Sequence, residues 1–437
     1  MPNESLDDTG TMGIIDQWES EVRSYVRSFP CVFDRAEGSR LWDEDGRCYI
    51  DFFSGAGALN YGHNHPLLKA PLLRYLERNG ITHSLDMATR AKTEFLESFA
   101  EIVLEPRGLD FKVQFPGPTG TNAVESALKL ARKITGRDSI VSFTNAFHGM
   151  TLGSLSVTGN AFKRRGAGVP LGNSACMPFD GYFGTDIDTV EYFDTLLLDQ
   201  GSGVDLPAAV IVETIQAEGG VRVASSAWLR ALAAACHRHD VLLIVDDVQV
   251  GCGRTGPFFS FERAGIQPDL VCLSKSLSGM GLPLAVTLIR PELDQWEPGE
   301  HNGTFRGHNP AFVTARAALE SFWQDEDLSR EVVAKGQHVH RFLTELAGKC
   351  GIARESVRGL GLIQGLDLEN TGLTREVCRR AFESGLILES SGPESTVLKI
   401  MPPLLVDTAT LEEGLHRLAA SVIGALEAGS AETETHA

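Results

Sequence analysis

The sequence contains no apolar run long enough to cross a membrane. Its longest apolar runs, such as VLLIV before Asp246, fall far short of the roughly 20 residues that span a bilayer. The beginning of the chain, MPNESLDDTG, is polar and acidic, and it lacks the basic and apolar regions of a secretory signal. We therefore expect a protein without a membrane role, located in the cytoplasm.

Positive charge is scarce as well. The chain has 39 lysines and arginines against 58 aspartates and glutamates, which gives a formal net charge of −19 at pH 7. Such a surface repels the phosphate backbone to which nucleic-acid-binding proteins must bind. We expect no nucleic acid among the partners.

Patterns typical of disulfides and metal sites are missing. The eight cysteines are scattered and include no CxxC pair, so we expect reduced thiols that pack as small apolar groups. In CHRH (236–239) and HVH (338–340) the histidines are two residues apart, and on a helix such side chains point in different directions. The sequence therefore predicts no metal site.

What the sequence does contain is a regular alternation of strand-like and helix-like segments. A length of 437 residues, at ~150 residues per domain, allows about three compact units or one large α/β core with a smaller lobe. Continuous apolar strands that alternate with helices are typical of a mostly parallel sheet covered on both faces, so the predicted fold class is α/β. The segments are, in order, KVQF near 112, TNAVESALKLARK, SIVSF near 140, AAVIVETI near 208, WLRALAAACHRH, VLLIVDDV and DLVCLSKS.

The two ends of the chain have a different character. Helical patterns dominate from about 327 to 427, around strand-like pieces such as GLIQGLDL and VLKIM, which indicates a second, α+β lobe. Residues 1–12 and 428–437 are small, polar and without periodicity, so we expect flexible tails there. No internal repeat or long linker separates the remaining parts, and we expect one interlocked fold.

Chemically active side chains stand at the ends of two predicted strands. Asp246, Asp247 and Gln249 follow VLLIV, and Lys275 follows DLVCL. In open α/β sheets ligands bind at the carboxyl ends of the strands, so the acid and the amine should face one crevice. A lysine in a desolvated crevice has a lowered pKa and attacks carbonyl carbons, which is the chemistry of Schiff-base cofactors. A buried ion pair without chemistry explains these two residues alone equally well.

A third element has the features of an anion-binding turn. After KVQF the chain reads PGPTGTN (116–122) and then enters an amphipathic helix, whose first N–H groups would hold a phosphate near Gly120 and Thr121. The alternative is an ordinary helix start capped by Thr121 or Asn122. Phe147, before a His-Gly pair, is placed to lie against a flat cofactor ring, although such an aromatic is more often part of the core.

One glycine-rich segment matches a motif that the rest of the sequence does not support. GCGRTG (251–256) has the pattern of a dinucleotide-binding turn and follows a strand-like run. However, the bulky run PFFSF stands where a helix of small residues belongs, and the next acid, Asp269, precedes its strand where the ribose-binding acid should end it. We therefore expect no nicotinamide cofactor.

In this order and combination, the segments resemble the class III aminotransferases, fold type I enzymes that use pyridoxal 5′-phosphate (PLP). The resemblance covers about residues 32–426. Its motifs are TGTNAVE (119–125) for the phosphate turn, Phe147 before His-Gly, and DDVQVGCGRTG (246–256) for the signature strand. Asp247 replaces a usual glutamate, at a position that is not the partner of the pyridine nitrogen.

The resemblance implies a particular architecture. A large PLP-binding domain with a mostly parallel sheet is expected at 66–322, and a smaller α+β domain from both chain ends is expected at 13–65 and 323–427. Thr304 in NGTFRG (302–307) matches a threonine that reaches the phosphate in the neighbouring subunit. The resemblance therefore implies a homo-oligomer of at least two subunits with shared active sites.

The resemblance also implies roles for single residues. Lys275 stands where the family's Schiff-base lysine stands, and Asp246 would keep the pyridine nitrogen protonated, so these two are the implied catalytic residues. The other implied cofactor contacts are Gln249 at the ring oxygen, Phe147 on the ring face with the adjacent His148, and Gly120, Thr121 and a neighbouring subunit's Thr304 at the phosphate.

Several stretches resemble the diaminobutyrate:2-oxoglutarate aminotransferases of the ectoine type. They are ESEVRSY (19–25), RSFP (27–30), GAGALNYGH (55–63) and TFRG (304–307). The implied reaction moves an amino group reversibly between L-glutamate and L-aspartate 4-semialdehyde, and gives L-2,4-diaminobutyrate and 2-oxoglutarate. The alternatives are an ornithine- or 4-aminobutyrate-type ω-aminotransferase, diaminobutyrate supply for a siderophore or peptide antibiotic, and a PLP-fold protein that binds without turnover.

The substrate contacts depart from the family pattern at one position. An arginine before the PPL element commonly binds the α-carboxylate of glutamate and pairs with a gate glutamate, whereas this chain has Lys399. Glu218 matches the gate glutamate, and Glu213 ends the strand before it. Because a lysine offers a point charge without a bidentate fork, we expect Arg306 to share carboxylate recognition.

Overall fold

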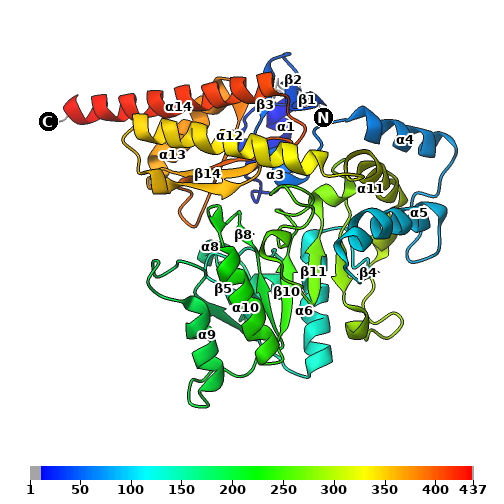
Figure 1. Ribbon diagram of the computed structural model, residues 1–437. Coiled ribbons are helices and arrows are strands. Elements are labelled where there is room, and N and C mark those ends of the chain that lie inside the picture. The colour runs from blue at the N-terminus through cyan, green and yellow to red at the C-terminus, as the bar shows by residue number, and fades with distance from the viewer. Residues whose placement is uncertain (1–10, 436–437) are drawn as a thin grey trace, which may run out of the picture.

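A seven-stranded sheet forms the centre of the molecule (Figure 1). The computed structural model describes residues 11–435. Strand β12 (Val286–Ile289) runs antiparallel to both of its neighbours, and the other neighbouring pairs are parallel. The mostly parallel α/β sheet predicted from the sequence is therefore confirmed. In spatial order the strands are β4 (Lys112–Gln114), β12 (Val286–Ile289), β11 (Leu270–Leu273), β10 (Leu242–Asp246), β7 (Ala209–Val212), β5 (Ile140–Phe143) and β6 (Ser174–Met177).

The strands of this sheet are apolar on both faces because helices cover both. Ile211 and Ile244 pack on the side of α6 (Gly120–Thr135), which contacts β11 and β12. The alternate residue Val245 packs on the side of α10 (Ser226–Arg238). Because successive side chains point to opposite faces, a strand covered on both sides reads as a continuous apolar run.

Further helices surround the sheet. α11 (Asn309–Phe322) contacts both α4 (Pro66–Glu77) and α5 (Arg90–Phe99), and α9 (Thr189–Leu198) contacts α10 (Figure 1). The shorter elements are α7 (Leu152–Ser156), α8 (Ala161–Arg165), the π-helix η1 (Ala100–Leu104), the 3-10 helices η2 (Glu105–Arg107), η3 (Glu262–Ala264), η4 (Lys275–Ser278), η5 (Pro291–Leu293) and η6 (Thr304–Gly307), and the hairpin of β8 (Ile215–Gln216) and β9 (Arg222–Val223).

The second part of the molecule is an α+β unit to which both chain ends contribute, as expected. An antiparallel sheet has the order β13 (Val357–Leu360), β14 (Ile363–Asp367), β17 (Val397–Ile400) and β16 (Glu389–Ser391). Its helices are α12 (Asp327–Lys349), α13 (Thr371–Glu383) and α14 (Thr408–Thr435), which lie together at one end of the molecule in Figure 1. The short 3-10 helix η7 (Arg354–Ser356) precedes β13.

The N-terminal segment is joined to this unit through a second small sheet. Its strands are β1 (Phe33–Glu37), β2 (Arg40–Asp43), β3 (Cys48–Asp51) and β15 (Leu386–Ile387), and β15 pairs with β3 in parallel. The pairing places residues 50 and 51 beside 386 and 387. The same part of the chain contains α1 (Thr11–Trp18), α2 (Tyr25–Ser28) and α3 (Ser54–Gly57).

The predicted C-terminal tail is helical over most of its length. α14 continues through Thr435, whereas the sequence pattern predicted a flexible tail from 428. The segment is rich in alanine and glutamate, which extend a helix once it has started, even without an apolar face. Of the predicted N-terminal tail, residues 1–10 lie outside the described part of the chain, and α1 begins at Thr11.

The glycine-rich segment 251–256 forms a turn that joins the two parts of the molecule. Turns and the 3-10 helix η3 follow it, where the sequence has the bulky run PFFSF. Arg254 is fully buried, and its guanidinium donates to the Asn60 side chain at 2.6 Å, to the Leu362 carbonyl at 2.9 Å and to the Pro402 carbonyl. The segment therefore has a structural role.

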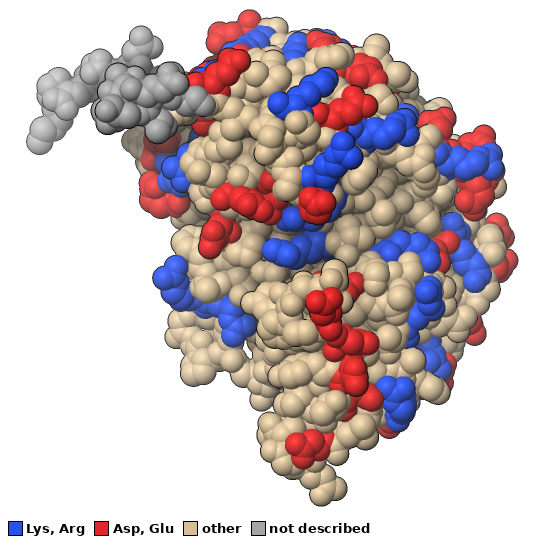
Figure 2. All heavy atoms as spheres, turned by 60° about the vertical axis from the view of Figure 1, so that its left-hand side comes forward, with Lys and Arg blue, Asp and Glu red and all other residues tan. Residues whose placement is uncertain are grey.

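The surface carries charged side chains of both signs. On the face shown in Figure 2, acidic and basic side chains are interspersed. Over the described residues, no helix is long and apolar enough to cross a membrane, and no group of three or more His, Cys, Asp or Glu side chains could hold a metal ion. The eight cysteines are all free.

Candidate active site

The two predicted catalytic residues lie at the same edge of the central sheet. Asp246 is the last residue of β10, and Lys275 is the first residue of η4, directly beyond the end of β11. Because β10 and β11 are parallel neighbours, both side chains leave the sheet at its carboxyl edge. The charge of Asp246 acts on the Lys275 amine, which places both groups in one electrostatic environment.

Asp246 has a histidine as its hydrogen-bonding partner. Its side chain is buried, with Oδ2 2.7 Å from His148 Nδ1, while Oδ1 accepts the Val248 N–H at 3.1 Å. The other ring nitrogen of His148, Nε2, is buried without a partner among the described residues. The hydrogen-bonding partner that a buried acid requires is therefore His148, which the sequence placed in the site only through its position after Phe147.

Lys275 has a strained backbone and a perturbed amine. Its φ of 49° lies in the left-handed region, which residues other than glycine occupy rarely and often at functional sites. Burial lowers the pKa of the amine, although the carboxylates of Glu218 and Asp246 act in the opposite direction. A lower pKa increases the fraction of neutral amine, the form that attacks a carbonyl carbon.

Helix α6 begins against this edge because Gly120 has no side chain. A Cβ atom at Gly120 would lie only 2.7 Å from Cγ1 of Val248 and 3.6 Å from Cβ of Ser274. The helix start therefore packs between the chain segments that follow β10 and β11. This arrangement brings the positive end of the helix dipole, with its N–H groups, next to the residue that precedes Lys275, where an anion would be stabilised.

The cap of α6 differs from both caps considered from the sequence. Thr119 is the N-cap residue, and its N–H donates to Asn122 Oδ1 at 3.1 Å in a capping box. Thr121 lies in the first turn, where its hydroxyl is 2.7 Å from Thr151 Oγ1 and 2.9 Å from Ser154 Oγ. Thr121 and Asn122 are therefore wrong as caps, because the helix starts earlier than the amphipathic pattern does.

A second charged cluster lies beside Lys275. Lys399 Nζ is 2.6 Å from Glu218 Oε1 and 2.6 Å from Glu389 Oε1, and Gln249 Nε2 donates to Glu218 Oε1 at 3.1 Å. Burial alone would raise the pKa of Glu218, but the Lys399 and Lys275 ammonium groups lower it. The two carboxylates raise the pKa of Lys399 against the effect of burial, so Lys399 remains charged.

Glu389 is a member of this cluster that sequence reasoning missed. It faces Lys399 across the strands β16 and β17, where Glu389 and Lys399 are register partners. The charge of Glu389 also acts on the Tyr25 hydroxyl, which belongs to the other end of the chain. Register and a contact from the other end of the chain leave no signal in a single sequence, so no local motif could have identified Glu389.

Glu213 supports the segment that contains Phe147. Its Oε2 accepts the Phe147 N–H at 2.9 Å, and burial, followed by the charge of Asp246, raises the pKa of Glu213 well above its usual value. Lys163 Nζ lies 4.0 Å from the centre of the Phe147 ring. The structure therefore ties Glu213 to the positioning of Phe147, whereas the sequence placed it among the substrate contacts.

Thr304 and Arg306 lie in a different cluster from Lys275 within one chain. Thr304 is exposed on η6, and its carbonyl oxygen is 2.6 Å from His83 Nε2. Arg306 is paired with Asp86 at 2.7 Å and also contacts the Asn302 side chain. A pocket of about 100 Å³ adjoins Arg306, and none of the Lys275, Asp246 or Lys399 side chains lines it.

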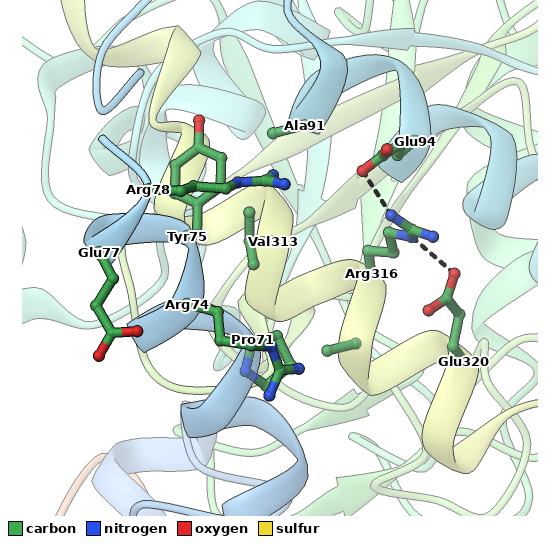
Figure 3. Close-up of a pocket in the computed structure, with 11 residues that line it drawn as sticks. Pro71, Arg74, Tyr75, Glu77, Arg78, Ala91, Glu94, Val313, Arg316 and Glu320 are labelled. Atoms are coloured by element: carbon green, nitrogen blue, oxygen red, sulfur yellow. Dashed lines mark hydrogen bonds and ion pairs between the residues drawn. The ribbon is translucent and has the colours of Figure 1, made fainter. Parts of the chain in front are cut away.

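A larger pocket, of about 700 Å³, lies away from the predicted site (Figure 3). It is formed by α4, α5 and α11, and none of the predicted site residues lines it. Its Arg316 is already paired with Glu94 at 2.5 Å and with Glu320 at 2.7 Å. Because these charges are satisfied within the chain, the pocket does not compete with the sheet edge as an active site.

The residues at the sheet edge fit PLP. The buried carboxylate of Asp246 suits a protonated pyridine nitrogen, the start of α6 at Gly120 suits a phosphate, and the Lys275 amine suits the aldehyde carbon. Nε2 of His148, the residue that contacts Asp246, is buried and has no hydrogen-bonding partner among the described residues. PLP is therefore chemically compatible with the observed donors.

Comparisons with known proteins agree with this site. Residues 22–422 match the family "Aminotransferase class-III". The chain is 59% identical to a diaminobutyrate–2-oxoglutarate transaminase of Streptomyces anulatus, covering 94% of this chain and 97% of the relative. It is 55% identical to a protein of the same name from Virgibacillus pantothenticus, covering 94% of this chain and 99% of the relative.

The fold has close structural relatives too. An ornithine aminotransferase from Toxoplasma gondii superposes with a TM-score of 0.82 at 26% identity, over 95% of this chain and 94% of the other. The family match covers most of the chain and includes every predicted site residue. The resemblance seen in the sequence is therefore confirmed, and this chain belongs to the class III aminotransferases.

Proposed function

We propose that this chain is a PLP-dependent diaminobutyrate–2-oxoglutarate transaminase. It would move an amino group reversibly between L-glutamate and L-aspartate 4-semialdehyde, and form L-2,4-diaminobutyrate and 2-oxoglutarate. The observation that carries the proposal is the pair of Asp246 and Lys275 at the carboxyl edge of two parallel strands. The specific substrates are supported by relatives of this name at 55% and 59% identity over nearly the whole chain.

PLP, when bound, supplies an electron-accepting ring that stabilises negative charge on the substrate carbon. Asp246 would hold the ring nitrogen in its protonated form, and His148 fixes the orientation of the carboxylate from its other side. Gln249 would hydrogen-bond the ring oxygen. Phe147 would cover one face of the ring, in a position set by the bond from its N–H to Glu213.

The phosphate would be held at the start of α6. Gly120 and Thr121 belong to its first turn, where the N–H groups and the dipole favour an anion. Thr304 would complete the phosphate site from a second subunit, since it is exposed and lies outside the Lys275 cluster of its own chain. Arg306 would accompany Thr304 in binding a carboxylate of the substrate.

Lys275 would have two tasks in turn. Its amine would hold PLP at the aldehyde carbon, and it would be free for a second task once substrate is bound. The freed amine would then take the proton from the substrate carbon that bears the amino group and return it at the C4′ position. The lowered pKa of Lys275 suits this task, because the neutral amine is the base.

The proposal is tested by the visible absorption spectrum of the purified protein, before and after 2,4-diaminobutyrate is added without an acceptor. We expect a PLP band that bleaches with diaminobutyrate and also with glutamate. A band that responds to ornithine or 4-aminobutyrate but not to diaminobutyrate would leave the site intact and overturn the substrate. A protein that shows no band after addition of PLP would overturn the assignment as an enzyme.

An ornithine- or 4-aminobutyrate-type ω-aminotransferase is the second candidate. It is favoured by the similarity to the Toxoplasma gondii ornithine aminotransferase, which extends over 95% of this chain at 26% identity. The identities of 55% and 59% to the diaminobutyrate enzymes weigh more, because they are far higher over the same length.

We also propose the context in which the enzyme works. The protein would act in the cytoplasm as a homodimer or a larger assembly, because Thr304 can complete a phosphate site only from a second subunit. Its product would supply the biosynthesis of ectoine. Size-exclusion chromatography with light scattering tests the assembly, and a monomeric but fully active protein would contradict the shared site.

A further inference from the structure

The environment of Lys399 differs from that of a residue ready to receive a substrate carboxylate. Its side chain is fully buried on β17. Glu389 is its register partner on β16, and Gly365, which has no side chain, is its partner on β14. With Glu218 and Glu389 both at 2.6 Å, the ammonium group already has two carboxylate partners within the chain.

The cluster carries more negative than positive charge. Glu218 and Glu389 bring two carboxylates to the single ammonium group of Lys399. The Glu218 carboxylate is further stabilised by a hydrogen bond from Gln249 and by the charge of Lys275. Burial raises the pKa of Glu389 in spite of Lys399, so Glu389 is the less compensated of the two carboxylates. A buried carboxylate of this kind is stabilised by a further cation.

Short contacts connect Glu389 to the predicted cofactor contact Gln249: Lys399 pairs with both Glu389 and Glu218, and Glu218 accepts a hydrogen bond from Gln249. The charges of Glu389 and Lys275 act on each other. The Glu389 side chain retains an exposed fraction of 11%. A substrate held at Lys275 by one end can therefore place its other end near Glu389.

We propose that Glu389 is a specificity residue that binds the α-ammonium group of a diamino acid whose distal amine reacts at the Lys275 site. This inference rests on the proposed function and names the group that distinguishes its substrate. 2,4-Diaminobutyrate and 4-aminobutyrate have the same chain, carboxylate and reacting amine, and they differ only in the α-ammonium group. Glutamate reacts through its α-amine and has no second ammonium group to offer.

The test compares Glu389→Gln with the wild-type holoenzyme in three half-reactions, with 2,4-diaminobutyrate, 4-aminobutyrate or glutamate as the amine donor. The measured quantity is kcat/KM for the loss of the PLP band. We expect the preference for diaminobutyrate over 4-aminobutyrate to fall by about 10- to 100-fold, the factor that a charged hydrogen bond contributes. The loss should arise mainly in KM for diaminobutyrate, and it should be larger for diaminobutyrate than for glutamate.

The matched control is Glu394→Gln, which removes the same charge from an exposed residue of the turn between β16 and β17 and should change none of the three values. If Glu389→Gln does not fold, Glu389→Asp is used, which retains the charge but shortens the side chain. An unchanged ratio of the two amines, or an equal loss with all three donors, would overturn the inference.

Failure of the proposed function gives a different pattern. If the wild-type enzyme accepts ornithine and rejects diaminobutyrate, the proposed substrate is wrong. The role of Glu389 is then tested on ornithine against 5-aminopentanoate, a second pair that differs only in the α-ammonium group. A fall of this ratio in Glu389→Gln would support Glu389, and a constant ratio would reject it.

Discussion

At the scale of single residues, the contact between Asp246 and His148 decides how the Asp246 carboxylate is oriented. The carboxylate is held from one side by His148 at 2.7 Å and by the Val248 N–H at 3.1 Å. Both contacts are made inside the sheet edge, where little water enters. The pair therefore presents a fixed negative charge to whatever binds beside it, without reorganisation during the reaction.

Asp246→Asn should abolish most of the turnover. The amide retains the shape of the side chain but carries no charge, so a bound ring nitrogen is no longer held protonated. We expect the glutamate half-reaction, followed by stopped-flow absorption, to slow by at least about 100-fold. The exposed Asp325→Asn serves as the control. A rate within about 2-fold of wild type would contradict the role of Asp246.

Asp247→Asn should change how stability depends on pH. Burial raises the pKa of Asp247 from 3.8 to about 7, although Ser260 donates hydrogen bonds to both of its oxygens. Between these pH values the folded state binds more protons than the unfolded state, so wild-type stability falls as pH rises. Relative to Asp247→Asn, the wild type should lose at most about 3 kcal/mol between pH 5 and pH 8.

Urea unfolding of both proteins at pH 5 and pH 8 measures this difference. The comparison between two proteins cancels the other titrating groups, which they share. Asp325→Asn, at an exposed position, is again the control. Parallel curves for wild type and Asp247→Asn would show that Asp247 titrates alike in the folded and unfolded states.

The site residues that could be predicted are those fixed by a local motif. Asp246, Gln249 and Lys275 directly follow apolar strands, so their place at the sheet edge could be read from the chain itself. Glu389 could not, because its contact with Lys399 depends on the register of two strands. The partner of Arg306 was also missed, since Asp86 is remote in sequence.

At the scale of elements, the start of α6 is the feature that couples packing to cofactor binding. Gly120→Ala would place a Cβ atom 2.7 Å from Val248 Cγ1. We expect the helix start to move, with a loss of about 1 to 3 kcal/mol in stability and weaker PLP binding. Thermal unfolding and PLP titration of the apoenzyme measure the two effects.

A second substitution separates crowding from other causes. Val248→Ala removes the atom in conflict, so the double variant should recover much of the lost PLP affinity. Gly348→Ala, on α12 with nothing within 4 Å of the new Cβ, is the control and should be neutral or slightly stabilising. A double variant as weak as Gly120→Ala would show that the steric explanation is wrong.

Whether a helix or strand could be predicted also depends on whether a local sequence pattern encodes it. Strands buried on both faces, such as β7 and β10, were identified because their apolar runs are continuous. The antiparallel direction of β12 was not predicted, because a short apolar run has the same pattern in either direction. The extension of α14 to Thr435 was missed because it depends on helix propagation and has no apolar periodicity.

At the scale of the whole molecule, Arg254 joins parts of the chain that are distant in sequence. Its guanidinium bonds to Asn60, Leu362 and Pro402, and burial lowers its pKa to about 9. Arg254→Met would leave these acceptors without a donor. We expect a loss of about 3 to 5 kcal/mol in urea unfolding, whereas the exposed Arg330→Met should lose less than about 1 kcal/mol.

If Arg254→Met unfolded with wild-type stability, the hydrogen bonds to the three acceptors would make no net contribution to the free energy of unfolding. The fold class and the two-part architecture were predictable from the alternation of strands and helices. The hydrogen bonds by which Arg254 joins distant parts of the chain were not predictable. Its segment was recognised only as a failed dinucleotide motif, because a single sequence does not show which distant carbonyl groups an arginine will meet.

The pairing of β3 with β15 also determines how late the N-terminal sheet can be completed while the chain is synthesised on the ribosome. Residues 50 and 51 find their partners in β15 only when 386 and 387 have been made. At about 5 to 20 residues per second, the first strand must wait for about 20 to 70 s. During that interval β3 has an unpaired edge, and the apolar residues Tyr49 and Ile50, buried in the finished protein, lack their cover. Chaperones that bind nascent chains should therefore engage the N-terminal segment until almost the whole polypeptide has emerged.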